Sequence, residues 1–217
     1  MVVKFINVIT IASPQSGFNS FYRHETTCTI TGSPRVATIA TLERSQIITL
    51  LDIPYHSQRD NRRDPWRTCN STSCFMAVEG IKPGLWRSDC DYIDELYNHY
   101  GDTTNHSAHT NMLWNKGIKS SFHYDLDYEN LSASLKRGKA IVVGVLHKGT
   151  IFNPYGGGHM IVIIGEYEGG YIAHDPWGYP FSYRPGSSGA SVLLPYESLD
   201  ARWLVEGKKS GWGRIFH

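Results

Sequence analysis

Three apolar segments in the C-terminal part of the chain constrain its fold most. Ala140–Leu146 is an unbroken apolar run, Met160–Gly165 is a second, and Tyr171–Asp175 follows across a turn at Glu168–Gly170. Short apolar runs that are rich in β-branched residues and bounded by glycine are typical of buried strands. Because only a tight turn separates the last two runs, we expect them to pair as antiparallel strands.

The chain before this predicted sheet has mostly helical character. We expect a strand at Ile47–Tyr55, a polar loop at 56–68, and helices at Cys69–Gly80, Asp91–Tyr100, His109–Lys116 and Tyr128–Arg137. Gly80 ends the first helix and Gly138 closes the last one. Helices first and strands afterwards indicate an α+β fold, with a helical part packed on an antiparallel sheet.

Residues 1–48 differ in composition from the rest of the chain. They are rich in β-branched residues, serine, threonine and glycine, and read as short strands with turns. The total of 217 residues suffices for one domain and a small extension. We therefore predict a β-rich extension at 1–48 and a main domain at 49–217. The extension adds strands to the main sheet or, as an alternative, forms a small segment that docks substrate or cell wall.

Charge and hydropathy exclude some classes of partner. The net charge is +1 and the basic clusters are short, so no field for nucleic acid is expected. No run approaches the ~20 apolar residues of a membrane span. The segment Met1–Ser13 faintly resembles a signal peptide, but Asn7 and Thr10 interrupt its apolar core, and we interpret it as a strand. The sequence predicts no compartment and no oligomeric state, and synthesis in the cytoplasm with action on the wall remains open.

Cys69 is a candidate nucleophile because it opens a predicted helix. A free thiol titrates near pH ~8.5, and the N–H groups and dipole at a helix start stabilise its anion. The alternative is a buried structural cysteine, an interpretation that fits Cys74 better. The four cysteines have no zinc-site spacing. If one is a nucleophile, the other three cannot all pair, so we expect no disulfide scaffold, although one bridge remains open.

His159 and Asp175 are candidate partners for this thiol. Gly156–Gly158 precede His159 and offer open backbone, so Gly157 and Gly158 are predicted to bind a substrate chain. Asp175 lies sixteen residues later, on the same face of the predicted hairpin. An ideal register separates the two by about four residues, so a bulge, or a His159 that precedes regular pairing, must close the gap. The alternatives are a surface histidine and a plain turn at Asp175.

Gln58 is a candidate oxyanion donor. Acyl transfer to a thiol needs donors aimed at the developing oxyanion, and the Gln58 amide and the Cys69 backbone N–H would supply two. The alternative is an ordinary loop glutamine. Trp177 is predicted to line the substrate site or to screen Asp175 from water, although most tryptophans are packing residues. Asn70 is predicted to lie at the rim of the site.

Four segments together resemble a known family. They are Ile53–Gln58, Cys69–Ser73, Gly157–His159 and Asp175–Trp177, and they are similar to the double-glycine (bacteriocin-processing) peptidases. The likeness covers roughly residues 50–180 and is nearest to a stand-alone, transporter-free branch in bacteria and phages. It implies a papain-like cysteine peptidase fold. Family members usually have Gly-Pro after the nucleophile, where this chain has Asn70–Ser71.

The resemblance also implies roles for the candidate residues. Cys69 would be the nucleophile, His159 the general base and then acid, Asp175 the orienter of the histidine, and Gln58 the oxyanion donor. No transporter domain follows, so we expect no leader processing coupled to export. Relatives of the stand-alone kind often look like lysins or wall-remodelling enzymes.

The expected function is hydrolysis of amide bonds by a thiol acyl-enzyme, with peptidoglycan peptides as substrate in a wall hydrolase or phage lysin. One alternative is a protease that processes a phage or bacterial protein. Another is an inactive binding module on a papain-like scaffold, against which the complete candidate set argues. No cofactor is expected.

Two groups of polar residues were considered as metal ligands. His106 and His109 with Asp102 have a spacing compatible with zinc, but no further ligand is evident. Asp125, Asp127 and Glu129 alternate as calcium ligands do, but the glycine of a calcium loop is absent, and caps of a helix are the preferred interpretation. The sequence therefore predicts no metal site.

Overall fold

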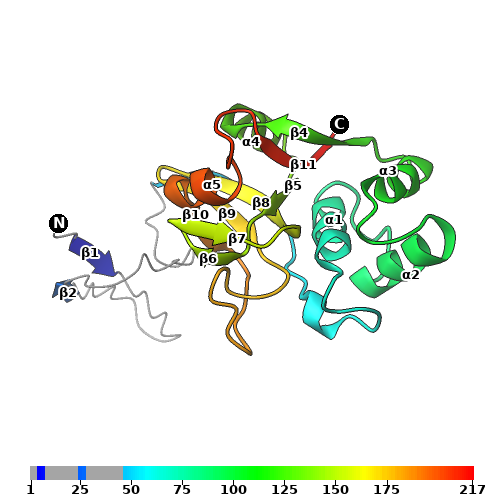
Figure 1. Ribbon diagram of the computed structural model, residues 1–217, viewed down its shortest axis with the longest axis horizontal. Coiled ribbons are helices and arrows are strands. Elements are labelled where there is room, and N and C mark those ends of the chain that lie inside the picture. Colours follow the sequence, from blue (N-terminus) through cyan, green and yellow to red (C-terminus); the bar gives the residue numbers. More distant parts are fainter. Residues whose placement is uncertain (1–3, 8–23, 28–45) are drawn as a thin grey trace, which may run out of the picture. The chain divides into compact units, whose positions relative to one another are not determined.

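The computed structural model describes residues 4–7, 24–27 and 46–217 (Figure 1). The chain divides into two compact units, Met1–Arg35 and Val36–His217. In the first unit, β1 (Lys4–Asn7) pairs antiparallel with β2 (His24–Thr27). The strand expected near the N-terminus is thus present as β1, whereas most of 1–48, with Cys28, lies outside the described residues.

The second unit is built on a seven-stranded sheet whose order is β10-β9-β8-β5-β11-β4, with β3 also paired to β8. All described pairings in this sheet are antiparallel. The strands are β3 (Ile47–Leu50), β4 (Ser120–Leu126), β5 (Ile141–Val145), β8 (His159–Tyr167), β9 (Gly170–His174), β10 (Val192–Pro195) and β11 (Gly211–Phe216).

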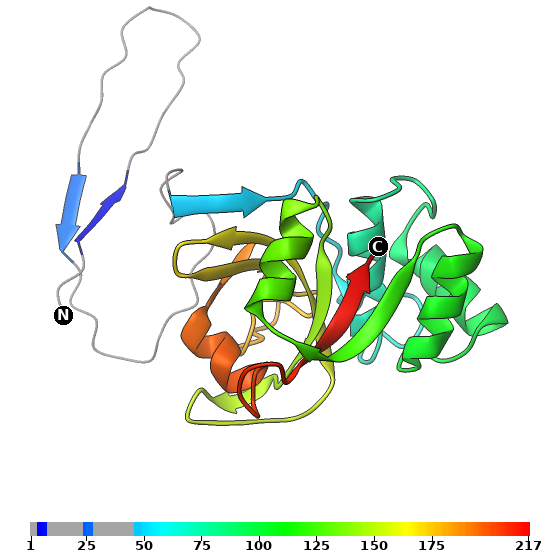
Figure 2. The ribbon, with the colours of Figure 1, turned by 90° about the horizontal axis from the view of Figure 1, so that it is seen from above.

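Helices cover both faces of this sheet. Figures 1 and 2 show α1, α2 and α3 gathered at one side of the unit, with α5 and a small hairpin at the other side. The helices are α1 (Cys69–Glu79), α2 (Asp89–His99), α3 (His106–Asn115), α4 (Tyr128–Lys136), α5 (Tyr196–Arg202) and the short η3 (Gln58–Asp60). The hairpin consists of β6 (Lys148–Thr150) and β7 (Asn153–Tyr155).

The two cores explain why the central strands β5, β8 and β9 are buried at every position. Met160 and Val162 of β8 belong to the core under α1–α3, whereas Ile161 and Ile163 belong to the core under α4 and α5. Successive side chains of a strand point to opposite faces, and here both faces are covered. The predicted α+β fold, with a helical part packed on an antiparallel sheet, is confirmed.

Several predicted boundaries differ from the observed ones. The strand expected at Ile47–Tyr55 ends at Leu50, and the helix expected from His109 begins at His106, because Asn105 caps it by accepting from two backbone N–H groups. The predicted domain boundary at residue 48 falls inside β3, whose pairing with β8 makes it part of the main sheet. β4, β10, β11 and α5 were not predicted.

A bulge in β8 adjusts the hairpin that carries His159 and Asp175. Near the turn Gly165 lies opposite Ile172, but beyond a register shift Val162 lies opposite His174. Without the shift, Asp175 would lie opposite Val162. The bulge moves Asp175 one residue nearer to His159 and onto the same face of the sheet as His159. The sequence required either a bulge or a His159 that precedes regular pairing; the structure has the bulge, and the pairing of β8 with β9 begins only at Val162, after His159.

Candidate active site

The start of α1 exposes unpaired backbone donors beside Cys69. Cys69 is the first residue of α1, and Thr68 at the N-cap makes no side-chain cap. The Thr68 hydroxyl instead accepts a hydrogen bond from Asn61 Nδ2 at 2.9 Å. The free N–H groups of the first turn and the helix dipole therefore remain available to an anion, such as the Cys69 thiolate.

Contacts between α1 and β8 bring Cys69 to the start of β8. Ser73 Oγ donates to the backbone oxygen of Met160 at 3.0 Å, one residue after His159. The partly buried Cys69 thiol donates to the backbone oxygen of Gly158 at 3.6 Å, one residue before it. The helix start and the strand start thus meet at a fixed position.

His159 and Asp175 form a close buried pair. The distance from His159 Nε2 to Asp175 Oδ1 is 2.7 Å, and the side chains are only 8% and 1% exposed. Asp175 Oδ1 also accepts the Trp177 backbone N–H at 2.9 Å, and Oδ2 accepts the Tyr183 hydroxyl at 3.2 Å. Because Asp175 occupies Nε2, Nδ1 is the ring nitrogen left for the thiol.

The local electrostatics favour a charged thiolate–imidazolium pair. Burial alone raises the pKa of Cys69, but the hydrogen bond and charge of His159 outweigh it and lower the pKa below its ordinary value. Burial alone lowers the pKa of His159, but the charge and hydrogen bond of Asp175, with those of Cys69, raise it to about 10. A thiolate is the nucleophilic form of cysteine.

Gln58 is anchored next to Asp175. Its backbone N–H donates to the Pro176 oxygen at 2.9 Å, and its buried side-chain Nε2 donates to the Pro65 oxygen at 2.8 Å. An amide nitrogen carries two hydrogens, and only one acceptor within the described part of the chain contacts Nε2. The side-chain oxygen Oε1 is buried and has no hydrogen-bond partner among the described residues. Gln58 therefore retains an unused donor.

Of the residues predicted to bind substrate, Gly157 and Gly158 lie at an open surface. Both are exposed, and a Cβ built on either would meet no atom within 4 Å. Gly158 has a φ of +87°, which other residues rarely adopt. This strip of bare backbone beside Cys69 leaves room for an extended chain.

Asn70 and Trp177 lie differently from expectation. Asn70 is 3% exposed, and its Nδ2 donates inward to the Thr103 oxygen at 2.8 Å, so its side chain does not reach the rim. Trp177 is half-buried, and the guanidinium of Arg59 lies over its ring, 4.8 Å from the ring centroid. The ring found edge-on to His159 is that of Tyr183, with centroids 5.7 Å apart.

Two residues near His159 were missed by the sequence interpretation. They are Tyr183, in the loop after β9, and His147, whose ring centroid lies 5.7 Å from that of His159. In the sequence they are a tyrosine in a loop of glycine, serine and proline and a histidine after a strand. No local pattern distinguishes them, because only the fold brings them to the site.

The groups considered as metal ligands have other partners. His109 is fully buried, with Nδ1 2.7 Å from the Tyr92 hydroxyl and Nε2 2.9 Å from the Thr103 oxygen, so both ring nitrogens are occupied. Asp127 caps α4 in a reciprocal pair with Asn130, as the cap interpretation expected. Within 4–7, 24–27 and 46–217, no three histidine, cysteine or acidic side chains are grouped to hold a metal.

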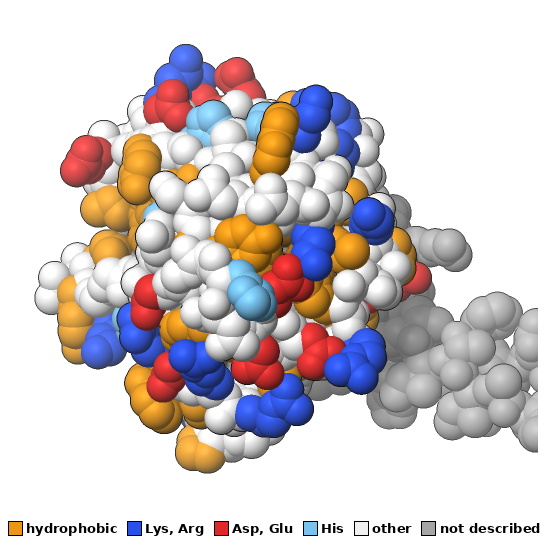
Figure 3. Space-filling model, turned by 90° about the vertical axis from the view of Figure 1, so that its right-hand side faces the viewer, with side chains coloured by type: hydrophobic (Ala, Val, Ile, Leu, Met, Phe, Trp, Pro, Cys, Tyr) orange, Lys and Arg blue, Asp and Glu red, His pale blue; other side chains and the backbone are white. Residues whose placement is uncertain are grey.

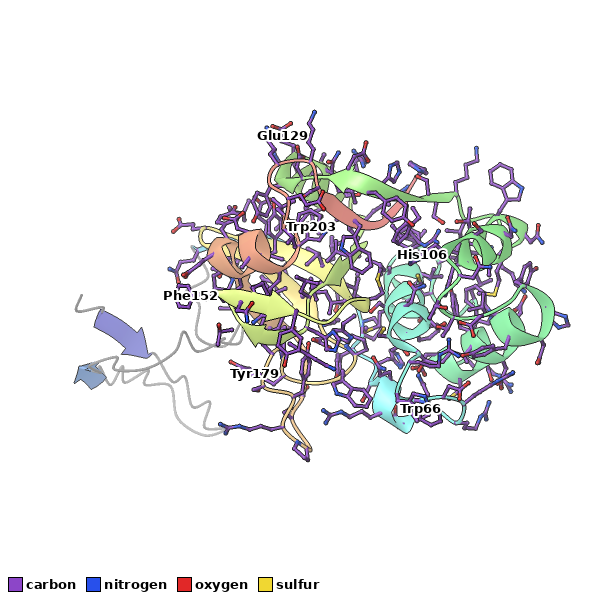
Figure 4. The ribbon with its side chains drawn as sticks, viewed as in Figure 1. Trp66, His106, Glu129, Phe152, Tyr179 and Trp203 are labelled. Atoms are coloured by element: carbon purple, nitrogen blue, oxygen red, sulfur yellow. The ribbon has the colours of Figure 1, made fainter. Side chains whose placement is uncertain are left out.

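The face of the molecule on the side of α1, α2 and α3 is mixed in charge. Figure 3 shows acidic and basic side chains interspersed over one face of the molecule, without a large patch of one sign. In Figure 4, Trp66 and Tyr179 lie toward the same edge, on the segments before α1 and after β9. Trp66 is 70% exposed. In the part of the chain that the structure describes, no helix is long and apolar enough to cross a bilayer.

More than half of the chain matches the model of a known protein family. The model of the Peptidase_C39 like family matches residues 50–185, more than half of the chain. The matched span contains Gln58, Cys69, His159, Asp175 and Tyr183. No curated protein matches the chain.

Proposed function

The chain belongs to the Peptidase_C39 like family of cysteine peptidases, and on that basis we propose that it hydrolyses peptide bonds with Cys69, His159 and Asp175 as its catalytic triad. The observation that supports this most is the 2.7 Å contact of His159 with Asp175, beside a thiol whose pKa is lowered by the same histidine. In this proposal, α1 supplies the nucleophile, β8 the base, and the residue after β9 the orienter of that base.

In the acylation step, the Cys69 thiolate attacks the carbonyl carbon of the scissile bond. The carbonyl oxygen gains negative charge, which the free Gln58 Nε2–H and the Cys69 backbone N–H stabilise. As the C–N bond breaks, the proton on His159 Nδ1 passes to the leaving amine. The products of this step are a free amine and a thioester on Cys69.

In the deacylation step, neutral His159 takes a proton from water. The resulting hydroxide attacks the thioester carbonyl, and the C–S bond breaks. The carboxylic acid leaves, the Cys69 thiolate is restored, and His159 is protonated again. Asp175 keeps its negative charge throughout and holds the imidazolium in place.

The exposed backbone at Gly157 and Gly158 is the proposed binding strip for the substrate. An extended peptide beside it would place a carbonyl near Cys69. For the substrate itself we propose peptides of bacterial peptidoglycan, as in a wall hydrolase or phage lysin, on the likeness of the motifs to stand-alone peptidases. The competing substrate is an unfolded protein.

Replacement of the nucleophile tests the reaction. We expect Cys69→Ala to abolish peptide cleavage while the melting temperature stays near that of the wild type. Cys90→Ala, in α2, is the matched control and should remain active. At neutral pH, iodoacetamide should alkylate Cys69 far faster than Cys74 or Cys90. Equal, slow labelling of Cys69, Cys74 and Cys90 would contradict the proposal and favour an inert binding module. Activity in Cys69→Ala would contradict the role of Cys69 as nucleophile.

Digestion of defined peptidoglycan with mass analysis of the fragments tests the substrate. Cleavage at a peptide bond that is absent with Cys69→Ala supports a wall hydrolase. Cleavage of a denatured protein with intact peptidoglycan would instead identify a protein-processing protease, with the same chemistry at Cys69.

A further inference from the structure

Tyr183 contacts both members of the His159–Asp175 pair. Its hydroxyl donates to Asp175 Oδ2 at 3.2 Å, and its ring stands edge-on to His159 at 81° between ring planes. We propose that Tyr183 is a positioning residue, which fixes the Asp175 carboxylate and closes the His159–Asp175 pair off from water. This inference rests on the proposed function, because it assigns Tyr183 a part in holding the imidazolium of that mechanism.

The hydroxyl of Tyr183 provides a hydrogen-bond donor for the second carboxylate oxygen of Asp175, Oδ2. Oδ1 accepts from His159 and from the Trp177 backbone, whereas the Tyr183 hydroxyl is the donor found for Oδ2 among the described residues. Hydrogen bonds to both oxygens of a buried carboxylate favour its charged form and hold it in one orientation. Burial and the charge of Asp175 raise the pKa of Tyr183, so its phenol keeps the proton and remains a donor.

The loop that carries Tyr183 has an unusual backbone. Phe181 and Tyr183 have φ values of +65° and +41°, a region that residues other than glycine seldom occupy. Such conformations persist where surrounding contacts enforce them. Here the guanidinium of Arg59 donates to the backbone oxygens of Tyr183 and Arg184, each at 3.4 Å.

Arg59 connects this loop to the proposed oxyanion donor. It follows Gln58 directly in η3, and its guanidinium also lies over the Trp177 ring. The Tyr183 N–H is bonded to the Tyr179 oxygen at 2.9 Å, which tightens the turn. The contacts with Arg59 and Tyr179 therefore hold the backbone of Tyr183 in place, with its hydroxyl at Asp175.

The rings of Tyr183 and His147 also limit access of water. Tyr183 lies 5.7 Å from His159 and 6.4 Å from His147, so the three rings form one group. Exclusion of water strengthens the attraction between Asp175 and the His159 imidazolium. Loss of the Tyr183 ring should weaken that attraction and, through His159, the stabilisation of the Cys69 thiolate.

Two variants separate the hydroxyl from the ring. Tyr183→Phe removes only the hydroxyl, and we expect kcat to fall about tenfold with little change in KM. Tyr183→Ala also admits water, and we expect a larger fall in kcat and an upward shift in the pH midpoint of Cys69 alkylation. Tyr179→Phe is the matched control, since its hydroxyl has no hydrogen-bond partner within the described segments, and it should change neither quantity.

The two readouts distinguish this inference from the proposed function. If wild-type kcat and alkylation midpoint persist in both Tyr183 variants, the positioning role is wrong, whatever the substrate. If no peptide is cleaved by the wild type, the proposed function fails, but the shift of the alkylation midpoint in Tyr183→Ala still decides the role of Tyr183. Tyr183→Phe keeps the ring volume, so it decides the case if Tyr183→Ala does not fold.

Discussion

At the scale of the residue, the same side chain acquires different properties from its place in the fold. Burial raises the pKa of Cys74 inside α1, whereas at Cys69 the neighbouring His159 outweighs burial and lowers it. A similar contrast separates Asn70, which is turned inward, from the exposed Gly157. Residue type made these positions candidates, and the surroundings set the pKa of each thiol and the exposure of each side chain or backbone.

Gln58 allows a prediction that separates bond cleavage from thiol reactivity. In the proposed mechanism the unused N–H of Gln58 acts only when an oxyanion develops, so Gln58→Ala should lower kcat by about 10²–10³. Alkylation of Cys69 forms no oxyanion and should proceed at the wild-type rate. The measurement is kcat on a peptide substrate beside the iodoacetamide rate. Equal losses in both rates would contradict the oxyanion role and indicate general disturbance of the site.

At the scale of the element, close contacts across the sheet govern the sequence of the strands. Gly144 interrupts the apolar run of β5, and a Cβ built on it would lie 2.1 Å from the Trp212 ring of β11. The glycine therefore makes room for a tryptophan on the neighbouring strand. In β8, the bulge has a comparable role, because it sets the register that brings Asp175 toward His159.

Gly144→Ala is expected to destabilise the sheet. Trp212 or the strands must shift to accept the added methyl group, which by the usual cost of overpacking lowers the free energy of unfolding by about 1–3 kcal/mol. Gly157→Ala is the matched control, because a Cβ there meets nothing within 4 Å. Denaturant unfolding of both variants is the measurement. Equal stability of Gly144→Ala and the wild type would contradict the close packing.

At the scale of the whole molecule, buried polar side chains connect the layers. Arg214 of β11 is fully buried and donates to the His106 oxygen and to Thr110 in α3, and to Ser120 in β4. Arg202 of α5 is 2% exposed and donates to three backbone oxygens around the start of the β6–β7 hairpin. Both guanidinium groups donate to backbone or hydroxyl oxygens, and none of these acceptors is a carboxylate. The two arginines thus connect distant segments through hydrogen bonds to neutral groups.

Buried neutral histidines predict how stability depends on pH. Burial, and then the charge of Arg214, lower the pKa of His109 to about 3, from 6.5 in a free chain. Between these values the unfolded chain binds a proton that the folded protein refuses, so the free energy of unfolding falls as pH drops below about 6.5. His159 acts oppositely: its stabilising contribution is full below pH 6.5 and is lost as pH rises through about 10.

His109→Gln should flatten the acid limb of this profile. Each histidine that stays neutral contributes a slope of up to about 1.4 kcal/mol per pH unit, and the variant removes one such group. Urea unfolding between pH 5 and 6.5, a window that begins about one unit above the usual pKa values of carboxyl groups, is the measurement. The exposed His99 supplies the control, as His99→Gln should keep the wild-type slope. An unchanged slope in His109→Gln would show that His109 is not the group responsible.

Local patterns in the amino-acid sequence predicted the α+β class, the four central helices, the paired strands of the C-terminal hairpin and the candidate set Gln58, Cys69, His159 and Asp175. These features depend on local periodicity, on caps and turns, and on motifs in which neighbouring residues carry the signal. The strands β4 and β11 escaped prediction because they pair with each other from distant parts of the chain, and the short β10 was also missed.

The contacts between side chains from segments far apart in sequence depend on the three-dimensional fold. In the fold, Tyr183 and His147 lie beside His159, and the Asn70 side chain points inward. The Trp177 ring contacts the guanidinium of Arg59. The register shift in β8 and the uncommon φ at Tyr183 carry no local sequence signal. They follow from packing across the whole unit, and packing of this kind is a property of three-dimensional contacts rather than of sequence spacing.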